Sequence, residues 1–124
     1  MRTTYREGGG FEEAAAYSRA VRIGSHVAVS GTAPRELGDA YEQTREAIAR
    51  ALAAAAELGA SKDDVLRTRL LLAQGCEWAG AIRAHAEAFA GVEPANTTYF
   101  VSGFIPEGVL VEVELDAVVT EPPR

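Results

Sequence analysis

The sequence predicts an α+β fold in which two helices cover one face of a mostly antiparallel sheet. Three observations lead to this prediction. The apolar patterns follow the order β-β-α-β-α-β-β, a short turn joins the first two strands, and the last strand alternates between apolar and acidic residues. A doubly wound parallel sheet would instead alternate single strands with helices along the whole chain. At 124 residues, the chain has the length of one domain.

Strands are expected where β-branched and aromatic residues cluster between turn residues. Residues 24–26 form the turn of a predicted hairpin. A Leu-Leu-Leu run at 70–72 indicates a strand that is buried on both faces over part of its length. The final strand turns its acidic residues to one face and its apolar residues to the other. The five predicted strands are 17–23, 27–32, 65–73, 97–102 and 109–120.

Two helices are expected between these strands. The first begins after Asp39, which precedes Glu42 by three residues and forms with it the pattern of a capping box. Apolar residues then recur at helical spacing until Gly59, where a glycine typically ends a helix. The second helix is expected at 77–90, and Gly91 ends it. Its apolar residues fall within one narrow arc, which contains Trp78, Ile82, His85 and Phe89.

The whole chain, 1–124, is predicted to be a single domain, with residues 1–12 as a flexible arm and 121–124 as a tail. The N-terminus is polar and glycine-rich, which predicts no signal peptide. No apolar run reaches the length that a bilayer requires, so no membrane partner is expected. The single Cys76 excludes an intrachain disulfide and suits a cytoplasmic location.

The charge and the residue inventory exclude several classes of function. The net charge of −6 disfavours a nucleic-acid partner, because polyanion binding relies on clustered Lys and Arg residues. Two histidines and one cysteine provide no metal-binding pattern, so no metal site is expected. No phosphate-binding glycine loop or dinucleotide fingerprint is present, and the sequence therefore predicts no cofactor.

Four segments, in order, carry a resemblance to a known family. The segment Pro94-Ala95-Asn96-Thr97-Thr98, followed by the strand at 109–114, resembles the signature of the Rid (reactive intermediate deaminase, YjgF-type) family. The resemblance extends almost from end to end of the chain. The other matching segments are 17–24, 27–32, and 43–45 together with 58–65.

The resemblance implies a chorismate-mutase-like fold and a homotrimer with ligand clefts between subunits. It also implies hydrolysis of a reactive imine or enamine to a carbonyl compound and ammonia. Glu112 matches the family's acidic residue, which orients the attacking water. Strand alternation alone would make Glu112 a solvated carboxylate. The family's ligand-binding positions correspond to Tyr17, Ser30, Gly31, Asn96 and Thr98.

Asn96 departs from the family pattern, in which an arginine grips the carboxylate of the substrate. An amide cannot replace the planar, charged fork of a guanidinium at equal strength. Loss of such a partner typically costs about 2–5 kcal/mol of binding, unless another cation replaces it. The sequence offers Arg83, Arg19 and Arg69 as candidate cations and does not choose among them, although helical geometry directs Arg83 away from the apolar arc.

Three functions remain open from the sequence. The first is an imine or enamine hydrolase with a small-molecule substrate that is not a standard imino acid. The second is a non-catalytic trimer that binds a small carbonyl or carboxylate metabolite. The third is an enzyme of one dedicated pathway built on the same scaffold.

Overall fold

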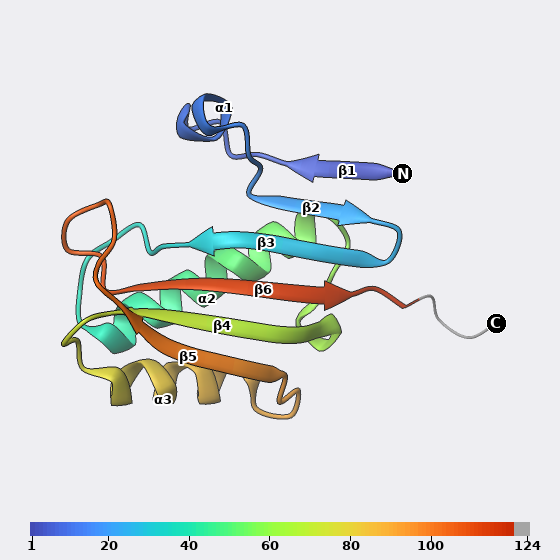
Figure 1. Ribbon diagram of the computed structural model, residues 1–124. Helices are drawn as coiled ribbons and strands as arrows, with labels where there is room; N and C mark the ends of the chain where they lie inside the picture. Colours follow the sequence, from blue (N-terminus) through green and yellow to red (C-terminus); the bar gives the residue numbers. More distant parts are fainter. Residues whose placement is uncertain (121–124) are drawn as a thin grey trace.

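The computed structural model, described for residues 1–120, has one six-stranded sheet (Figure 1). The strands are β1 (Arg2–Tyr5), β2 (Ala20–Ile23), β3 (His26–Thr32), β4 (Val65–Ala73), β5 (Ala95–Val101) and β6 (Val111–Val118). Their order across the sheet is β1-β2-β3-β6-β4-β5. Neighbouring strands are antiparallel except β4 and β5, which are parallel. The predicted α+β class and mostly antiparallel sheet are confirmed.

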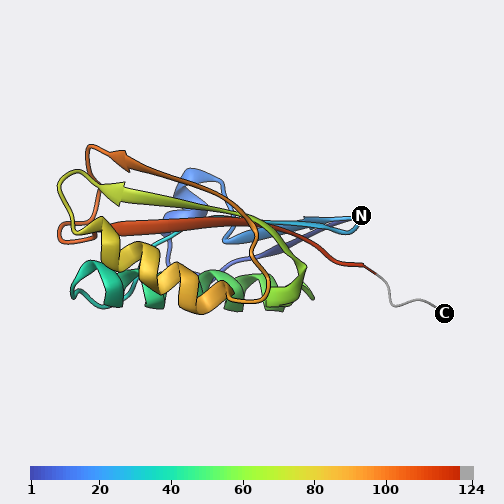
Figure 2. The same cartoon turned by 90° about the horizontal axis from the view of Figure 1, so that it is seen from below.

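The two long helices lie together against one face of the sheet, and Figure 2 shows that neither of them covers the other face. The helical elements are α1 (Phe11–Ala15), α2 (Ala40–Glu57), the short 3₁₀ turn η1 (Lys62–Asp64) and α3 (Trp78–Phe89). Within residues 1–120, no helix combines the length and apolar character needed to cross a bilayer.

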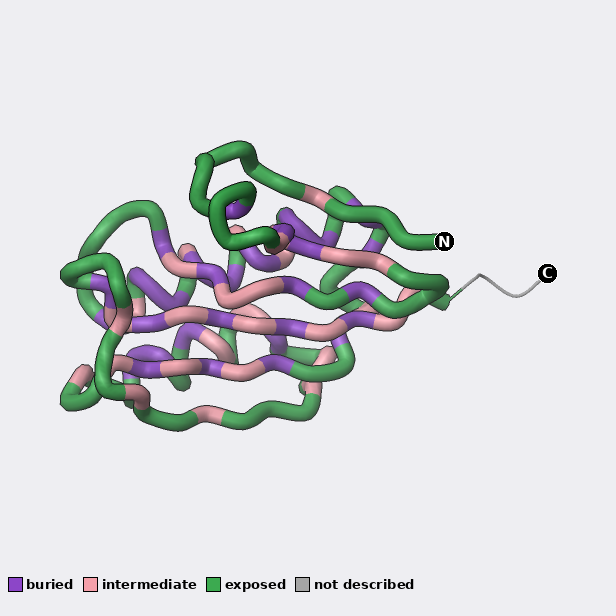
Figure 3. The backbone as a smooth tube through the Cα atoms, turned by 45° about the horizontal axis from the view of Figure 1, so that its top comes forward, coloured by how far each residue is buried: buried purple, intermediate pink, exposed green. Residues whose placement is uncertain are grey.

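The core lies between the sheet and the helices. The alternating sequence of β6 explains the position of the core. Its apolar residues point to the helices, and Val111, Val113 and Leu115 have no exposed surface. The alternating acidic residues point to the uncovered face and are only partly buried. Figure 3 shows the same alternation of buried and partly buried positions along the central strands.

Local signals place α2 where the sequence predicted it. Asp39 and Glu42 form the expected capping box: the Glu42 N–H donates to Asp39 Oδ1 at 2.8 Å, and the Asp39 N–H donates to Glu42 Oε1 at 3.1 Å. These two bonds satisfy backbone donors that the first helical turn leaves without partners. At the other end, Gly59 has a φ of 91°, a conformation that glycine adopts without strain.

The N-terminal segment differs from the prediction of a flexible arm at 1–12. β1 pairs with β2 from Arg2↔Ile23 to Tyr5↔Ala20. The carboxylate of Glu12, which is 4% exposed, accepts the Glu7 N–H at 3.0 Å and so joins α1 to the end of β1. A four-residue polar strand has no periodic signal of its own, and its backbone pairing becomes apparent only in the assembled sheet. The predicted tail, 121–124, lies outside the described residues.

The apolar arc of α3 contacts the core only in part. Phe89 is 2% exposed, but Trp78 and Ile82 are 57% and 39% exposed. The small residues Ala81 and Ala84 make the contact with the core in their place, with exposures of 0% and 2%. Close approach of a helix favours such small side chains, so the largest apolar residues of α3 do not mark its buried face.

Candidate functional site

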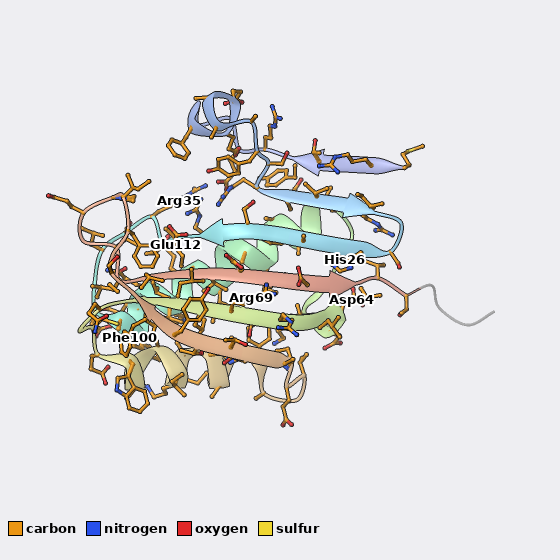
Figure 4. The ribbon with its side chains drawn as sticks, in the orientation of Figure 1. His26, Arg35, Asp64, Arg69, Phe100 and Glu112 are labelled. Carbon is orange, nitrogen blue, oxygen red and sulfur yellow. The ribbon has the colours of Figure 1, made fainter. Side chains whose placement is uncertain are left out.

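A cavity of about 510 Å³ lies where α1, β3, β6 and the loop before β6 meet. Its wall contains three residues that the sequence predicted for the site, which are Tyr17, Gly31 and Glu112. Figure 4 shows Glu112 near the start of β6, on the face of the sheet that the helices leave uncovered. The remaining wall consists of two arginines, of Ala33 after β3, and of residues from α1 and the loop.

Glu112 is the acidic group of the cavity. Its side chain is partly buried, and burial raises the pKa of its carboxyl group above the ordinary range. The positive charge of Arg19 lowers this pKa, and the negative charge of Glu114 raises it again. A carboxyl with a raised pKa in a cavity is suited to accept a proton near neutral pH.

Gly31 lies directly beneath this carboxylate. A Cβ atom added at Gly31 would be 2.5 Å from Glu112 Oε1, so any larger residue would displace the carboxylate. The β3–β6 register shifts between Val29 and Thr32, which places a bulge at Ser30 and Gly31. Bulges commonly reorient residues next to functional sites.

Ser30 supports this bulge and does not line the cavity. Its hydroxyl donates to the carbonyl oxygen of Ser18 at 2.6 Å, and its N–H donates to the carbonyl oxygen of Arg19 at 2.9 Å. Both groups are therefore engaged within the chain. The predicted role of Ser30 in ligand binding stays a prediction, and its contacts favour a role in positioning Gly31.

Arg19 is the cation nearest to this bulge. Its Nη2 donates to the carbonyl oxygen of Gly31 at 3.1 Å, and its guanidinium carbon lies 5.4 Å from the centre of the Tyr17 ring. Its Nε is 3.9 Å from Glu12 Oε1. These contacts hold the guanidinium at the cavity wall. The sequence named Arg19 as one of three candidate cations, and only this one of the three lines the cavity.

The other two candidate cations lie elsewhere. Arg83 stacks over the ring of Tyr41 at 4.2 Å, on the outer surface of the helices. Arg69 pairs with Glu114 at 3.5 Å and with Asp116 at 3.9 Å, near the middle of the uncovered face (Figure 4). Neither residue contributes to the cavity wall.

The second arginine of the cavity, Arg50, was not predicted from the sequence. It comes from α2, where its Nη1 donates to the carbonyl oxygen of Ala33 and its Nη2 to Glu7 Oε1 at 2.8 Å. Because helical position 50 and the N-terminal segment are far apart in the chain, no local pattern indicates this contact. A search for arginines near the predicted strand ends could not have found it.

The apolar residues of the cavity wall were also not predicted from the sequence. Phe104 and Ile105 belong to the loop before β6, and Phe11 belongs to α1. The side chain of Gln43 fastens this loop to α2: its Nε2 donates to the carbonyl oxygen of Gly108 at 2.9 Å, and its Oε1 accepts the Leu110 N–H at 2.7 Å. In the sequence, the only indication of this anchor was a glutamine within the expected first helix.

Asn96 and Thr98 do not join the cavity of the same chain. Asn96 pairs with Thr68 and Thr98 with Leu70, so both side chains point to the helix-covered side of β5. Glu112 pairs with Leu71 on the neighbouring strand β4 and points to the opposite face. The predicted set of site residues is therefore divided between the two faces of one sheet.

The amide of Asn96 is engaged in a chain of hydrogen bonds. Its Nδ2 donates to Thr68 Oγ1 at 3.0 Å, and its Oδ1 accepts the Thr98 hydroxyl at 2.8 Å. Thr68 Oγ1 is in turn 2.7 Å from Nε2 of His85. Burial lowers the pKa of His85, which favours the neutral imidazole. His85 is therefore a half-buried histidine with a hydrogen-bond partner.

Within the described residues, no three His, Cys, Asp or Glu side chains lie close enough together to hold a metal ion.

Comparisons with known proteins agree with this fold. The sequence model of the family described as endoribonuclease L-PSP matches residues 10–119. The chain is 40% identical to an uncharacterised protein of Streptomyces coelicolor over 118 residues, covering 90% of this chain and 88% of that protein. It is 31% identical to a RutC family protein of Pyrococcus abyssi over 105 residues, covering 79% and 82%.

A solved structure of the same family is similar throughout. The crystal structure of Rv2704 from Mycobacterium tuberculosis, a member of the YjgF/YER057c/UK114 family, superposes with a TM-score of 0.91. The two chains are 40% identical, and the match covers 96% of this chain and 100% of the other. These matches show that the chain belongs to the YjgF/RidA family, also described as endoribonuclease L-PSP.

Proposed function

We propose that this protein hydrolyses a reactive imine or enamine to a carbonyl compound and ammonia. The observation that carries the proposal is the position of Glu112, a half-buried carboxyl with a raised pKa above Gly31 on the wall of a cavity of about 510 Å³. Family membership supports the same chemistry. A general base needs both access to water and a pKa near the working pH.

In the proposed reaction, Glu112 orients a water molecule towards the carbon of the C=N bond. The water oxygen forms the new C–O bond while Glu112 accepts a proton. The carbinolamine formed from the protonated imine then loses its nitrogen. Glu112 returns its proton to the nitrogen and takes the hydroxyl proton as the C=O bond forms and the C–N bond breaks, so ammonia and a carbonyl compound are released. No oxidant or reductant is needed, because the step is a hydrolysis.

We also propose that the functional unit is a homotrimer. Family membership supports this assembly. The uncovered sheet face and the exposed edge strand β5 offer the surfaces for such contacts (Figure 3). Sedimentation equilibrium tests this assembly, and the mass of a monomer at micromolar concentration would contradict it.

Ammonia release tests the proposed activity. An amino-acid oxidase generates the imine in situ, and ammonia is measured with and without the protein. We expect the wild-type protein to accelerate release and Glu112→Gln to abolish the acceleration. Equal rates with the wild-type protein and with buffer would contradict the proposal.

A second candidate function is binding of a small carbonyl or carboxylate metabolite without turnover. The engaged amide of Asn96 disfavours turnover of the family's usual substrates, because the arginine that grips their carboxylate is absent at that position. Binding without turnover predicts thermal stabilisation that rises with the logarithm of the metabolite concentration above its Kd, together with ammonia release no faster than in buffer. Acceleration that depends on Glu112 would exclude it.

A further inference from the structure

The helix α1 forms one side of the cavity but buries little of its own surface. Phe11 at its start lines the cavity and is 61% exposed, and Tyr17 lines the cavity just after its end. Of the five residues of α1, only Glu12 is buried. Figure 1 shows α1 apart from the two long helices. A single helical turn has little stability by itself, so specific contacts must hold α1 in place.

The Glu12 carboxylate makes the contacts that hold α1. Both of its oxygens accept the Glu7 N–H at 3.0 Å, and its Oε1 is also 3.9 Å from Arg19 Nε. Glu7 is itself tied to the rest of the protein, because its carboxylate pairs with Arg50 at 2.8 Å and with Arg35 at 3.3 Å. Polar contacts, rather than apolar burial, therefore keep α1 at the cavity.

Movement of α1 away from the cavity would expose little apolar surface. Water would solvate the Glu12 carboxylate outside its site, so the charge would not become a buried group without partners. The movement would also separate the rings of Phe11 and Tyr17, whose centroids are 6.0 Å apart, but Phe11 is already mostly exposed. Segments with few buried apolar contacts open at a free energy below that of global unfolding.

The backbone at both ends of α1 is suited to a hinge. Gly10 at the start has a φ of 85°, and a Cβ atom added there would meet nothing within 4 Å, so packing does not restrain it. Ala16 at the end has a φ of 60°, a left-handed conformation that strains a residue other than glycine. Hinges are typically a few residues at the ends of elements, and opening would release the strain at Ala16.

We propose that residues 10–16 form a lid that opens and closes the cavity, with Gly10 and Ala16 as its hinges and the Glu12 carboxylate as its latch. In the closed state, which this structure shows, Phe11 forms part of the cavity wall. In the open state the Glu12 carboxylate is in water, and Phe11 has left the wall. That this movement admits a substrate rests on the proposed hydrolysis, whereas the movement itself does not.

Thiol labelling measures access to the cavity separately from catalysis. Ala33→Cys places a thiol in the cavity wall, and Cys76→Ala removes the only cysteine of the chain. The rate of reaction with N-ethylmaleimide, an uncharged probe, is measured in this double variant and after addition of Glu12→Gln or Glu13→Gln. Glu13→Gln is the matched control, because it removes the same charge from an exposed position of the same helix.

A thiol at an exposed position of α2, introduced by Ala56→Cys with Cys76→Ala, gives the rate without a lid. We expect the thiol at position 33 to react at least about tenfold more slowly than the thiol at position 56. Glu12→Gln should accelerate labelling at position 33 by about tenfold or more, since loss of a hydrogen bond to a charged group shifts an equilibrium by about that factor. It should leave position 56 unchanged, and Glu13→Gln should change neither rate. Equal rates at positions 33 and 56, or equal labelling at position 33 with Glu12→Gln and Glu13→Gln, would overturn the proposal.

Hydrogen exchange of the wild-type protein tests the lid even if Glu12→Gln unfolds the chain. The Ala14 N–H donates within the lid at 3.1 Å, and the Tyr17 N–H donates to the Glu12 carbonyl oxygen at 2.9 Å. Both amides should exchange at least about tenfold faster than the amides that join β4 and β6, at a rate that low denaturant leaves unchanged, because the opening exposes little surface. Exchange of all these amides at one rate, with the same dependence on denaturant, would also overturn the proposal.

The two proposals fail in different ways. Labelling at position 33 that depends on Glu12, without ammonia release, would remove the hydrolase and leave the lid. Ammonia release that depends on Glu112, with labelling at position 33 that does not depend on Glu12, would remove the lid and leave the hydrolase.

Discussion

Glu112 and Gly31 are in such close contact that a methyl group at position 31 would lie 2.5 Å from Glu112 Oε1. Gly31→Ala should therefore displace the carboxylate and lower the rate of ammonia release, in our estimate by about tenfold or more, as misplacement of a catalytic group typically does. The displaced atom is the end of a flexible side chain, so the fold should survive. Thermal unfolding and ammonia release check the two parts.

Gly9→Ala is the matched control. A Cβ atom at Gly9 would meet nothing within 4 Å, and its backbone is not in the left-handed region. Activity should be unchanged in this variant. Equal activity of Gly31→Ala and Gly9→Ala would contradict the role given to the Glu112 carboxylate.

Glu112→Gln should abolish turnover and raise the stability of the protein at neutral pH. Burial raises the pKa of Glu112 in the folded state, so the folded protein binds this proton more tightly than the unfolded chain. Stability from this group is therefore fully present below the unfolded pKa and is lost as the pH rises through the folded pKa. Glutamine does not titrate, so the Glu112→Gln variant should not lose this stability as the pH rises.

Unfolding temperatures measured from acidic to neutral pH check this prediction. The difference between Glu112→Gln and the wild-type protein should grow with pH and favour the variant. A variant that is less stable than the wild-type protein at neutral pH would show that the charged carboxylate stabilises the fold.

The pH dependence of turnover should report the coupling between Arg19 and Glu112. Glu112 must be deprotonated to act as a base. The midpoint of the acidic limb of the pH–rate profile should therefore lie at a pH above the ordinary pKa range of a glutamate. The charge of Arg19 lowers the pKa of Glu112. Removing that charge in Arg19→Gln should move the limb to higher pH, and an unchanged limb would contradict the coupling.

Asn96→Ala should weaken the fold and spare the cavity. The substitution removes the hydrogen bonds to Thr68 and Thr98, each of which contributes about 0.5–1.5 kcal/mol to the free energy of unfolding. Chemical denaturation measures this loss. Ammonia release should be retained, and its loss would assign Asn96 to the site.

Gln43→Leu should destabilise the protein by about 1–3 kcal/mol, because it removes the two hydrogen bonds to the backbone of Gly108 and Leu110, at about 0.5–1.5 kcal/mol each. The loop that carries Phe104 and Ile105 should loosen at the same time. Gln74→Leu is the control, since Gln74 is exposed. Equal unfolding curves for the two variants would contradict the anchoring role of Gln43.

Most of the fold was predictable because its elements carry local signals. β4 runs from Val65 to Ala73, with the bounds that the sequence predicted, and α2 follows its capping box. β1 carries no such signal, because four polar residues show no period and depend on pairing with β2. The length of an element and its own periodicity therefore decided what the sequence could predict.

The candidate site was predictable only in part, since it depends on which faces the strands turn to the cavity. Glu112 and Gly31 were identified from the resemblance, and the structure brings them together. Asn96 was assigned to the same site, yet the strand order places it on the other face of the sheet. Arg50 and Phe104 reach the cavity from distant segments, and only the assembled chain shows them as neighbours.

The most direct test of the account is the rate of ammonia release from the imine of leucine, generated by an amino-acid oxidase. Wild-type protein, Glu112→Gln and Gly9→Ala are compared at equal concentration. Acceleration by the wild-type protein and Gly9→Ala, together with the buffer rate for Glu112→Gln, is the predicted result. Equal acceleration by Glu112→Gln, or none by the wild-type protein, would contradict the central claim that Glu112 catalyses imine hydrolysis in this cavity.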